Sequence, residues 1–149
     1  MGAVVGWDIG GAHLKAARVE AGRVVRAVQV AAPLRLGLER LARSFAEAKA
    51  QMGPADRHVI TMTGELADTF NSRSEGVANL TAVAVRELAP APVQVYAGRA
   101  GFIVPQEAAA HVTDIASANW FASAALVGSA MDSALFMDMG STTIVSIGR

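Results

Sequence analysis

One strand–turn–strand pattern occurs twice in this chain, and both copies place an aspartate where the first strand meets a glycine turn. The first copy reads VVGWDIGGAHLK over residues 4–15, and the second reads ALFMDMGSTTIV over residues 134–145. Short apolar runs bounded by glycine and small residues predict strands, and two such runs joined by a tight turn predict a β-hairpin. The repeat therefore predicts two hairpins, with Asp8 and Asp138 at equivalent positions.

The first turn has the residues that binding of a phosphate group requires. Glycine has no Cβ and tolerates positive φ, so the backbone can approach a phosphate closely and its N–H groups can form a nest for the anion. Asp8 cannot contact the phosphate directly without repulsion, but it can do so through Mg²⁺, usually with water between them. Lys15, one of only two lysines in the chain, can reach back to the phosphate as a point charge. The predicted phosphate-binding residues of this turn are Gly10, Gly11, Ala12 and His13.

The second turn adds hydroxyl donors and a second carboxylate. Asp138 would hold the metal or orient a water from the other side, so Asp8, Lys15 and Asp138 are the predicted catalytic residues, and the two aspartates are the predicted Mg²⁺ ligands. A single Asp-x-Gly turn is usually only a hairpin, because both residues are common turn formers. Two matching turns, with a lysine beside the first, favour a phosphate site. The predicted phosphate-binding residues of the second turn are Gly140, Ser141, Thr142 and Thr143.

The hydrophobic periodicity predicts an α/β fold. Residues 3–8, 14–20 and 23–31 are three consecutive strand candidates, which favours an antiparallel meander. Helices and strands then alternate, which favours a mixed five-stranded sheet with flanking helices. The expected helices cover residues 36–52, 75–89 and 113–131, and the further strands cover residues 57–64, 93–97, 101–105, 134–140 and 143–148.

Composition limits the partners and the compartment. The 13 basic and 13 acidic residues balance, so no overall field attracts nucleic acid or an anionic membrane. The longest apolar segment, residues 115–131, is short and carries Ser and Asn, which predicts a buried helix and not a membrane span. The chain has no cysteine and no basic flank before its apolar start, so we expect a cytoplasmic protein.

A cluster of charged residues follows the strand expected at residues 57–64. Because ligands bind at the carboxyl ends of strands in open α/β sheets, this cluster predicts a substrate cleft, with Arg73 as the contact for a diphosphate. The alternative is a solvated start of the next helix. Asn119 is expected to face the cleft, whereas Trp120 and Phe121 are expected in the core. The cluster consists of Glu65, Asp68, Arg73 and Glu75, and the predicted cleft residues are Glu65, Arg73 and Asn119.

These motifs resemble those of a known superfamily. WDIGGAHLKAA and MDMGSTT resemble the two phosphate motifs of the actin, Hsp70 and sugar kinase superfamily. VVGWDIGGAHLKAA, TMTGELADTF, SEGV and SANWFASA are more similar to its hydantoinase/oxoprolinase-like branch, and within it to proteins of methanofuran and methylofuran biosynthesis in tetrahydromethanopterin-linked one-carbon metabolism. The resemblance covers nearly the whole chain. It implies a ribonuclease-H-like lobe of the actin-like ATPase type, with Mg²⁺ as the cofactor.

The resemblance also implies a transferase. The similar proteins join an aminomethylfuran diphosphate to the phenol of a glutamyltyramine and release pyrophosphate. Metal and lysine would stabilise the charge that grows on the leaving group. Two other functions stay open. One is a kinase or ATPase that binds ATP or another nucleotide, since the superfold does not fix the function. The other is a non-catalytic fragment or split subunit.

The chain departs from this family in its length and in its second motif. Family members are about twice as long, because they need two lobes around the ligand. We therefore expect residues 1–133 to form a first lobe and residues 134–149 to open a second, so that this chain alone is inactive. The family's Thr-Asp step is missing from GSTTIVSIG, which puts an acidic ligand in doubt. Bare strand edges on this hairpin predict a homodimer or a companion chain that supplies the second lobe.

Overall fold

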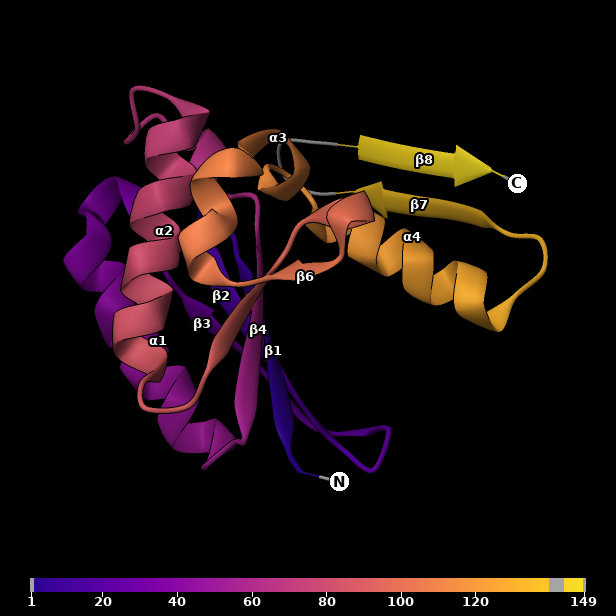
Figure 1. Cartoon of the computed structure of the whole chain (residues 1–149), viewed down its shortest axis with the longest axis horizontal. Helices are drawn as coiled ribbons and strands as arrows, with labels where there is room; N and C mark the ends of the chain where they lie inside the picture. Colours follow the sequence, from indigo (N-terminus) through magenta and orange to yellow (C-terminus); the bar gives the residue numbers. More distant parts are fainter. Residues whose placement is uncertain (1, 140–143, 149) are drawn as a thin grey trace.

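A six-stranded sheet forms the centre of the molecule (Figure 1). The computed structural model describes residues 2–139 and 144–148. The strand order in the sheet is β3-β2-β1-β4-β5-β6. The strands are β1 (Val4–Ile9), β2 (His13–Glu20), β3 (Arg23–Ala31), β4 (Arg57–Met62), β5 (Val93–Tyr96) and β6 (Phe102–Ile103).

The sheet is mixed. The first three strands form the predicted antiparallel meander, and β4 and β5 then continue the sheet in parallel with β1. The prediction of a five-stranded sheet was wrong by one, because Phe102 and Ile103, within the strand predicted over residues 101–105, pair antiparallel with β5 and add a sixth strand. This last strand is only two residues long, since Gly101 precedes it with φ 79° and Pro105 begins a 3₁₀ turn shortly after it.

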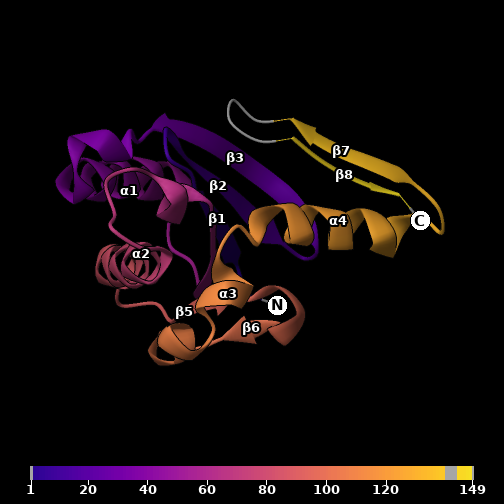
Figure 2. The ribbon, with the colours of Figure 1, turned by 90° about the horizontal axis from the view of Figure 1, so that it is seen from above.

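Helices cover both faces of the sheet. Two long helices pack on one face, and a third long helix lies over the other face (Figure 2). The first two are α1 (Leu38–Met52) and α2 (Arg73–Leu88), and the third is α4 (Asn119–Ala130), which follows the single turn α3 (Val112–Ile115). Short 3₁₀ turns connect these elements at η1 (Leu34–Leu36), η2 (Gly64–Leu66), η3 (Gly98–Ala100) and η4 (Pro105–Ala110).

The expectation of one continuous helix over residues 113–131 was wrong. Ser117 has φ 57°, in the left-handed region, and this conformation breaks the helix between α3 and α4. The break turns α4 away from α2 and over the opposite face of the sheet. Trp120 and Phe121 were expected in the core, but both are only half-buried, because α4 lies outside the layer between the sheet and α1 and α2.

The core lies between the sheet and the pair α1 and α2. Trp7 of β1 packs on Phe45 of α1, with ring centroids 5.2 Å apart. Its indole Nε1 donates to Nδ1 of His58 on β4, at 3.2 Å. Because side chains alternate along a strand, Trp7 faces this core while its neighbours Gly6 and Asp8 face α4. The alternation thus gives the sheet one packed face and one face that is free for a site.

The second predicted hairpin is present as a separate two-stranded sheet. Its strands, β7 (Leu135–Met139) and β8 (Ile144–Gly148), pair antiparallel, with Asp138 opposite Val145. Within residues 2–139 and 144–148, no helix combines the length and the apolar character that a bilayer crossing needs.

Candidate functional site

The first glycine turn closes tightly between β1 and β2. The backbone N–H of Gly10 donates to the carbonyl oxygen of His13 at 3.0 Å. A Cβ at position 10 would lie 3.0 Å from that oxygen, so the turn needs a glycine there for space. Neither Gly10 nor Gly11 has a positive φ, so the turn does not use that freedom of glycine. The backbone N–H groups of Gly11 and Ala12 have no acceptor in the described part of the chain, so these two N–H groups are the ones free to bind an anion.

Asp8 and Lys15 face each other across β1 and β2, directly below this turn. They are register partners, and Lys15 Nζ lies 3.3 Å from Asp8 Oδ2. The Lys15 side chain is 55% exposed and that of Asp8 is 23% exposed. An ion pair this exposed contributes only about 0–1 kcal/mol, so little energy is lost when the lysine moves to an incoming anion. The turn and the lysine therefore come together as the sequence predicts.

Two buried oxygen atoms beside this ion pair have no hydrogen-bond partner among the described residues. They are Oδ1 of Asp8 and Oγ1 of Thr61, which stand on neighbouring strands at paired positions. Buried polar atoms in native proteins nearly always have a hydrogen-bond partner, so two neighbouring oxygens without one point to a bound group. Thr61 was not among the predicted site residues, although its place near the carboxyl end of a predicted strand could have suggested it.

These oxygens fit a hard cation such as Mg²⁺, which binds carboxylate and hydroxyl oxygens and keeps several waters or phosphate oxygens. No group of three or more His, Cys, Asp or Glu within the described residues could hold a metal alone. Asp8 and Thr61 would therefore share the ion with water and ligand oxygens. The predicted ligand Asp138 lies on β7, where its backbone pairs with Val145, and its metal role stays a prediction.

A polar cavity of about 490 Å³ opens on this group. Asn119, at the first turn of α4, lines it together with Asp8, Lys15 and Thr61, so residues more than 100 positions apart in the chain meet here. Asn119 Oδ1 accepts a hydrogen bond from the backbone N–H of Trp120 at 2.7 Å. The remaining walls of this cavity are formed by Ala122, Ser123, Phe136 and Met137.

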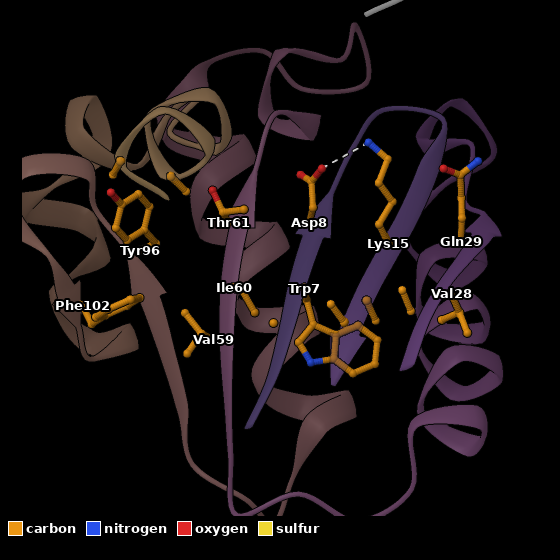
Figure 3. Close-up of a pocket in the computed structure, with 16 residues that line it drawn as sticks. Trp7, Asp8, Lys15, Val28, Gln29, Val59, Ile60, Thr61, Tyr96 and Phe102 are labelled. Carbon is orange, nitrogen blue, oxygen red and sulfur yellow. Dashed lines mark hydrogen bonds and ion pairs between the residues drawn. The ribbon is translucent and has the colours of Figure 1, made fainter. Parts of the chain in front are cut away.

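A larger, mostly apolar cavity of about 900 Å³ lies beside it, between the open face of the sheet and α4 (Figure 3). The two spaces meet at four residues that line both cavities, which are Asp8, Lys15, Thr61 and Ala122. The volume suits a small organic molecule, since ligand pockets usually span several hundred Å³ and have mainly apolar walls.

Glu65 and Arg73, which the sequence predicted for a cleft, line neither of these cavities. Glu65 is only 2% exposed, and its Oε1 accepts a hydrogen bond from Ser117 Oγ at 3.1 Å. Burial raises the pKa of its carboxyl above the usual range, against the opposing effects of its hydrogen bonds and of the Arg73 charge. Arg73 is exposed in the first turn of α2. Glu65 thus joins η2 to the break before α4.

Other predicted residues have structural partners or lie outside the described part. Glu75 caps the start of α2, because its N–H donates to Oγ of the N-cap Ser72 at 3.1 Å and its carboxylate accepts from the N–H of Asn71, the residue before the cap, at 2.8 Å. His13 is exposed at the start of β2, beside the turn. The predictions for Gly140, Ser141, Thr142 and Thr143 lie outside the described residues.

Comparisons with known proteins place this chain in a family. The family model described as Hydantoinase/oxoprolinase matches residues 56–147, which is more than half of the chain. One curated relative, from Methanocaldococcus jannaschii, is named (4-{4-[2-(gamma-L-glutamylamino)ethyl]phenoxymethyl}furan-2-yl)methanamine synthase. The two sequences are 31% identical over 144 residues, which is 94% of this chain and 41% of the relative. The chain thus spans about two-fifths of that relative's length, and it belongs to the hydantoinase/oxoprolinase family.

Proposed function

We propose that this chain is part of a transferase that joins an aminomethylfuran diphosphate to the phenol of a tyramine or glutamyltyramine and releases pyrophosphate. The single observation that carries the proposal is the pairing of Lys15 with Asp8 below the free N–H groups of Gly11 and Ala12. This arrangement offers positive charge, anion-binding N–H groups and a metal-binding carboxylate within one turn. The relative's printed name describes the furan–phenol ether that such a reaction forms.

In this reaction the bond between the furfuryl CH₂ carbon and the diphosphate oxygen breaks, and that oxygen keeps both electrons. A new bond forms between the same carbon and the phenol oxygen, whose proton passes to the solvent. Lys15 would move from Asp8 to the departing oxygens and stabilise their growing charge. Asp8 and Thr61 would hold Mg²⁺, which when bound neutralises charge on the diphosphate. Asp138 would complete this set from the second hairpin.

The fold supports the same assignment. The order β3-β2-β1-β4-β5, with an antiparallel meander followed by parallel strands, is the arrangement expected of a ribonuclease-H-like lobe of the actin-like type. We propose that residues 1–133 form this lobe and that the β7–β8 hairpin belongs to a second lobe around the ligand.

Calorimetry with inorganic pyrophosphate tests this proposal. The chain should bind pyrophosphate only in the presence of Mg²⁺, and Asp8→Ala should abolish this binding while the circular dichroism spectrum stays unchanged. Asp56→Ala is the matched control, because Asp56 is an exposed aspartate near the opposite end of the sheet. Unchanged affinity in Asp8→Ala would contradict the proposed site.

A second measurement separates this function from that of a kinase or ATPase. The chain and its variants are mixed with Mg²⁺, [5-(aminomethyl)furan-3-yl]methyl diphosphate and tyramine, and pyrophosphate and ether product are assayed. We expect weak ligand binding and no turnover by these 149 residues, because they span only about two-fifths of the relative's length. ATP binding that exceeds diphosphate binding, with release of ADP, would favour the kinase or ATPase. Absence of both kinds of binding would favour a non-catalytic subunit.

A further inference from the structure

The open face of the sheet has two rows of side chains that cross the strands side by side. The first, here called the polar row, takes one polar residue from each of five strands (Figure 3). The second, here called the small-residue row, lies two positions earlier on β1 and two later on β2. The polar row consists of Tyr96, Thr61, Asp8, Lys15 and Gln29, and the small-residue row consists of Gly6, Ala17 and Ala27.

The small-residue row forms one wall of the 900 Å³ cavity, and α4 forms the facing wall with Ala122 and Ala125. The named residues of both walls are small, and Val59 of β4, the register partner of Gly6, continues the sheet wall on the other side. Tyr96 and Phe102 close one end, with their ring centroids 5.4 Å apart. The result is an apolar space with hydrogen-bonding groups along one edge.

The glycine at position 6 is not explained by the packing of the described residues. It lies in the middle of β1, and its φ is not positive. A Cβ built on it would meet only the backbone oxygen of Ala17, at 4.0 Å. A glycine inside a strand destabilises the strand and often marks the close approach of a ligand or another backbone. At position 6 neither backbone conformation nor a described neighbour demands a glycine, so we look to a bound molecule.

We propose that this cavity binds the aromatic ring of an arylmethyl diphosphate, with the ring lying over Gly6 and the diphosphate directed to Lys15. This inference rests on the proposed function and names the place of the ring within it. A flat ring suits two facing walls of glycine and alanine, and Tyr96 and Phe102 offer aromatic contacts at its edge. Lys15 and Asp8 line both cavities, so a methylene between ring and diphosphate would pass through the polar row.

The test compares an inorganic diphosphate with its benzyl ester, which adds a methylene and a ring and has one ionisable oxygen fewer. Inorganic pyrophosphate and benzyl diphosphate are titrated into the chain with Mg²⁺ by calorimetry. The wild type should bind benzyl diphosphate roughly tenfold more tightly or better, because a buried ring contributes apolar area. Gly6→Val should remove this difference and leave the pyrophosphate affinity unchanged. Because the site of its side chain is open, Gly6→Val should fold with an unfolding temperature at or above that of the wild type.

Two further variants keep the result interpretable. Ala125→Leu fills the same cavity from α4 and should reduce ring binding in the same way. Gly128→Ala, on the exposed side of α4 with no atom within 4 Å of an added Cβ, is the matched control and should change neither affinity.

Each outcome decides the inference. Equal affinity of the wild type for both anions, or unchanged ring binding in Gly6→Val and Ala125→Leu, would overturn the ring site and leave the phosphate site standing. No binding of either anion would overturn the proposed function and the ring site together. If light scattering shows that Gly6→Val changes the assembly state while ring binding is kept, a polypeptide segment covers this face and the inference is wrong.

Discussion

His58 accepts the indole N–H of Trp7 at 3.2 Å, and both rings are buried between the sheet and α1. Burial, assisted by the charge of Lys49, lowers the pKa of His58 from 6.5 to about 4. The imidazole is therefore neutral at physiological pH, and its Nδ1 is free to accept. Protonation would remove this acceptor and place a charge in the core.

The pH dependence of stability follows from this pair. Between pH 4 and 6.5 the unfolded state binds more protons than the folded state, so the free energy of unfolding rises with pH. The contribution of His58 is complete above its unfolded pKa and is lost as pH falls toward its folded pKa, on the order of 3 kcal/mol in total. Urea unfolding, followed by tryptophan fluorescence, should show a smaller loss in His58→Gln than in the wild type. Equal slopes for His58→Gln and the wild type would contradict the assignment.

Lys15→Met should weaken pyrophosphate binding by about tenfold or more, because a charged hydrogen bond typically contributes roughly 1.5–3 kcal/mol. The unfolding free energy should change by less than about 1 kcal/mol, since the ion pair with Asp8 is exposed. Lys49→Met is the matched control for the loss of one lysine charge, although Lys49 also donates to the carbonyl oxygens of Glu87 and Ala89. Titration calorimetry at two salt concentrations measures the pyrophosphate affinity, and urea unfolding measures the unfolding free energy. An unchanged affinity in Lys15→Met would remove the lysine from the site.

Glu65→Gln should stabilise the protein increasingly as pH rises. Burial raises the pKa of this carboxyl, so the folded state holds the proton more strongly than the unfolded state. The associated stability is full at low pH and is lost as pH rises through the folded pKa. Glutamine can still accept the hydrogen bond from Ser117 and carries no charge. Urea unfolding at pH 5 and pH 8 checks this, and Glu65→Ala should be less stable at both, by about 1–3 kcal/mol.

The β7–β8 hairpin should mediate self-association. Leu135 is 70% exposed and Met137 is 61% exposed, and apolar surface of this kind marks contact sites. The double variant Leu135→Lys, Met137→Lys should lower the mass measured by light scattering to that of a monomer. Val24→Lys on β3, which is 65% exposed, is the control and should leave the mass unchanged. A monomeric wild type would contradict this prediction.

Much of the fold could be predicted because its signals are local. The meander over residues 4–31 follows from apolar runs joined by glycine turns, and the confirmed boundary of α1 at Gly53 follows from glycine and proline at the end of a helical period. The break at Ser117 could not be predicted, since serine in the left-handed region is set by tertiary contacts, including the bond to Glu65. A strand over residues 101–105 could be predicted from its apolar run, but its place in the sheet could not, because the antiparallel pairing of Phe102 and Ile103 with β5 is a tertiary contact.

Some features of the candidate site could likewise be predicted from the sequence, and others could not. The turn and Lys15 could be predicted because their chemistry is contiguous in sequence. The place of Thr61 near the end of a predicted strand was a signal, but its contact with Asp8 could not be predicted, because it depends on the register in which β4 pairs with β1. The opening over Gly6 depends on three strands and α4 together, although a glycine in the middle of an apolar strand was a signal that could have been followed.

The central place of β1 has a kinetic consequence. Its backbone is paired with β2 on one side and β4 on the other, so we expect its amides to exchange with solvent only when the whole sheet opens. Asp138 is carried by a hairpin that, among the described residues, pairs only with itself, and such hairpins open readily. A ligand that bridges Asp8 and Asp138 would therefore be captured and released on the timescale of the hairpin, while the sheet beneath it stays closed.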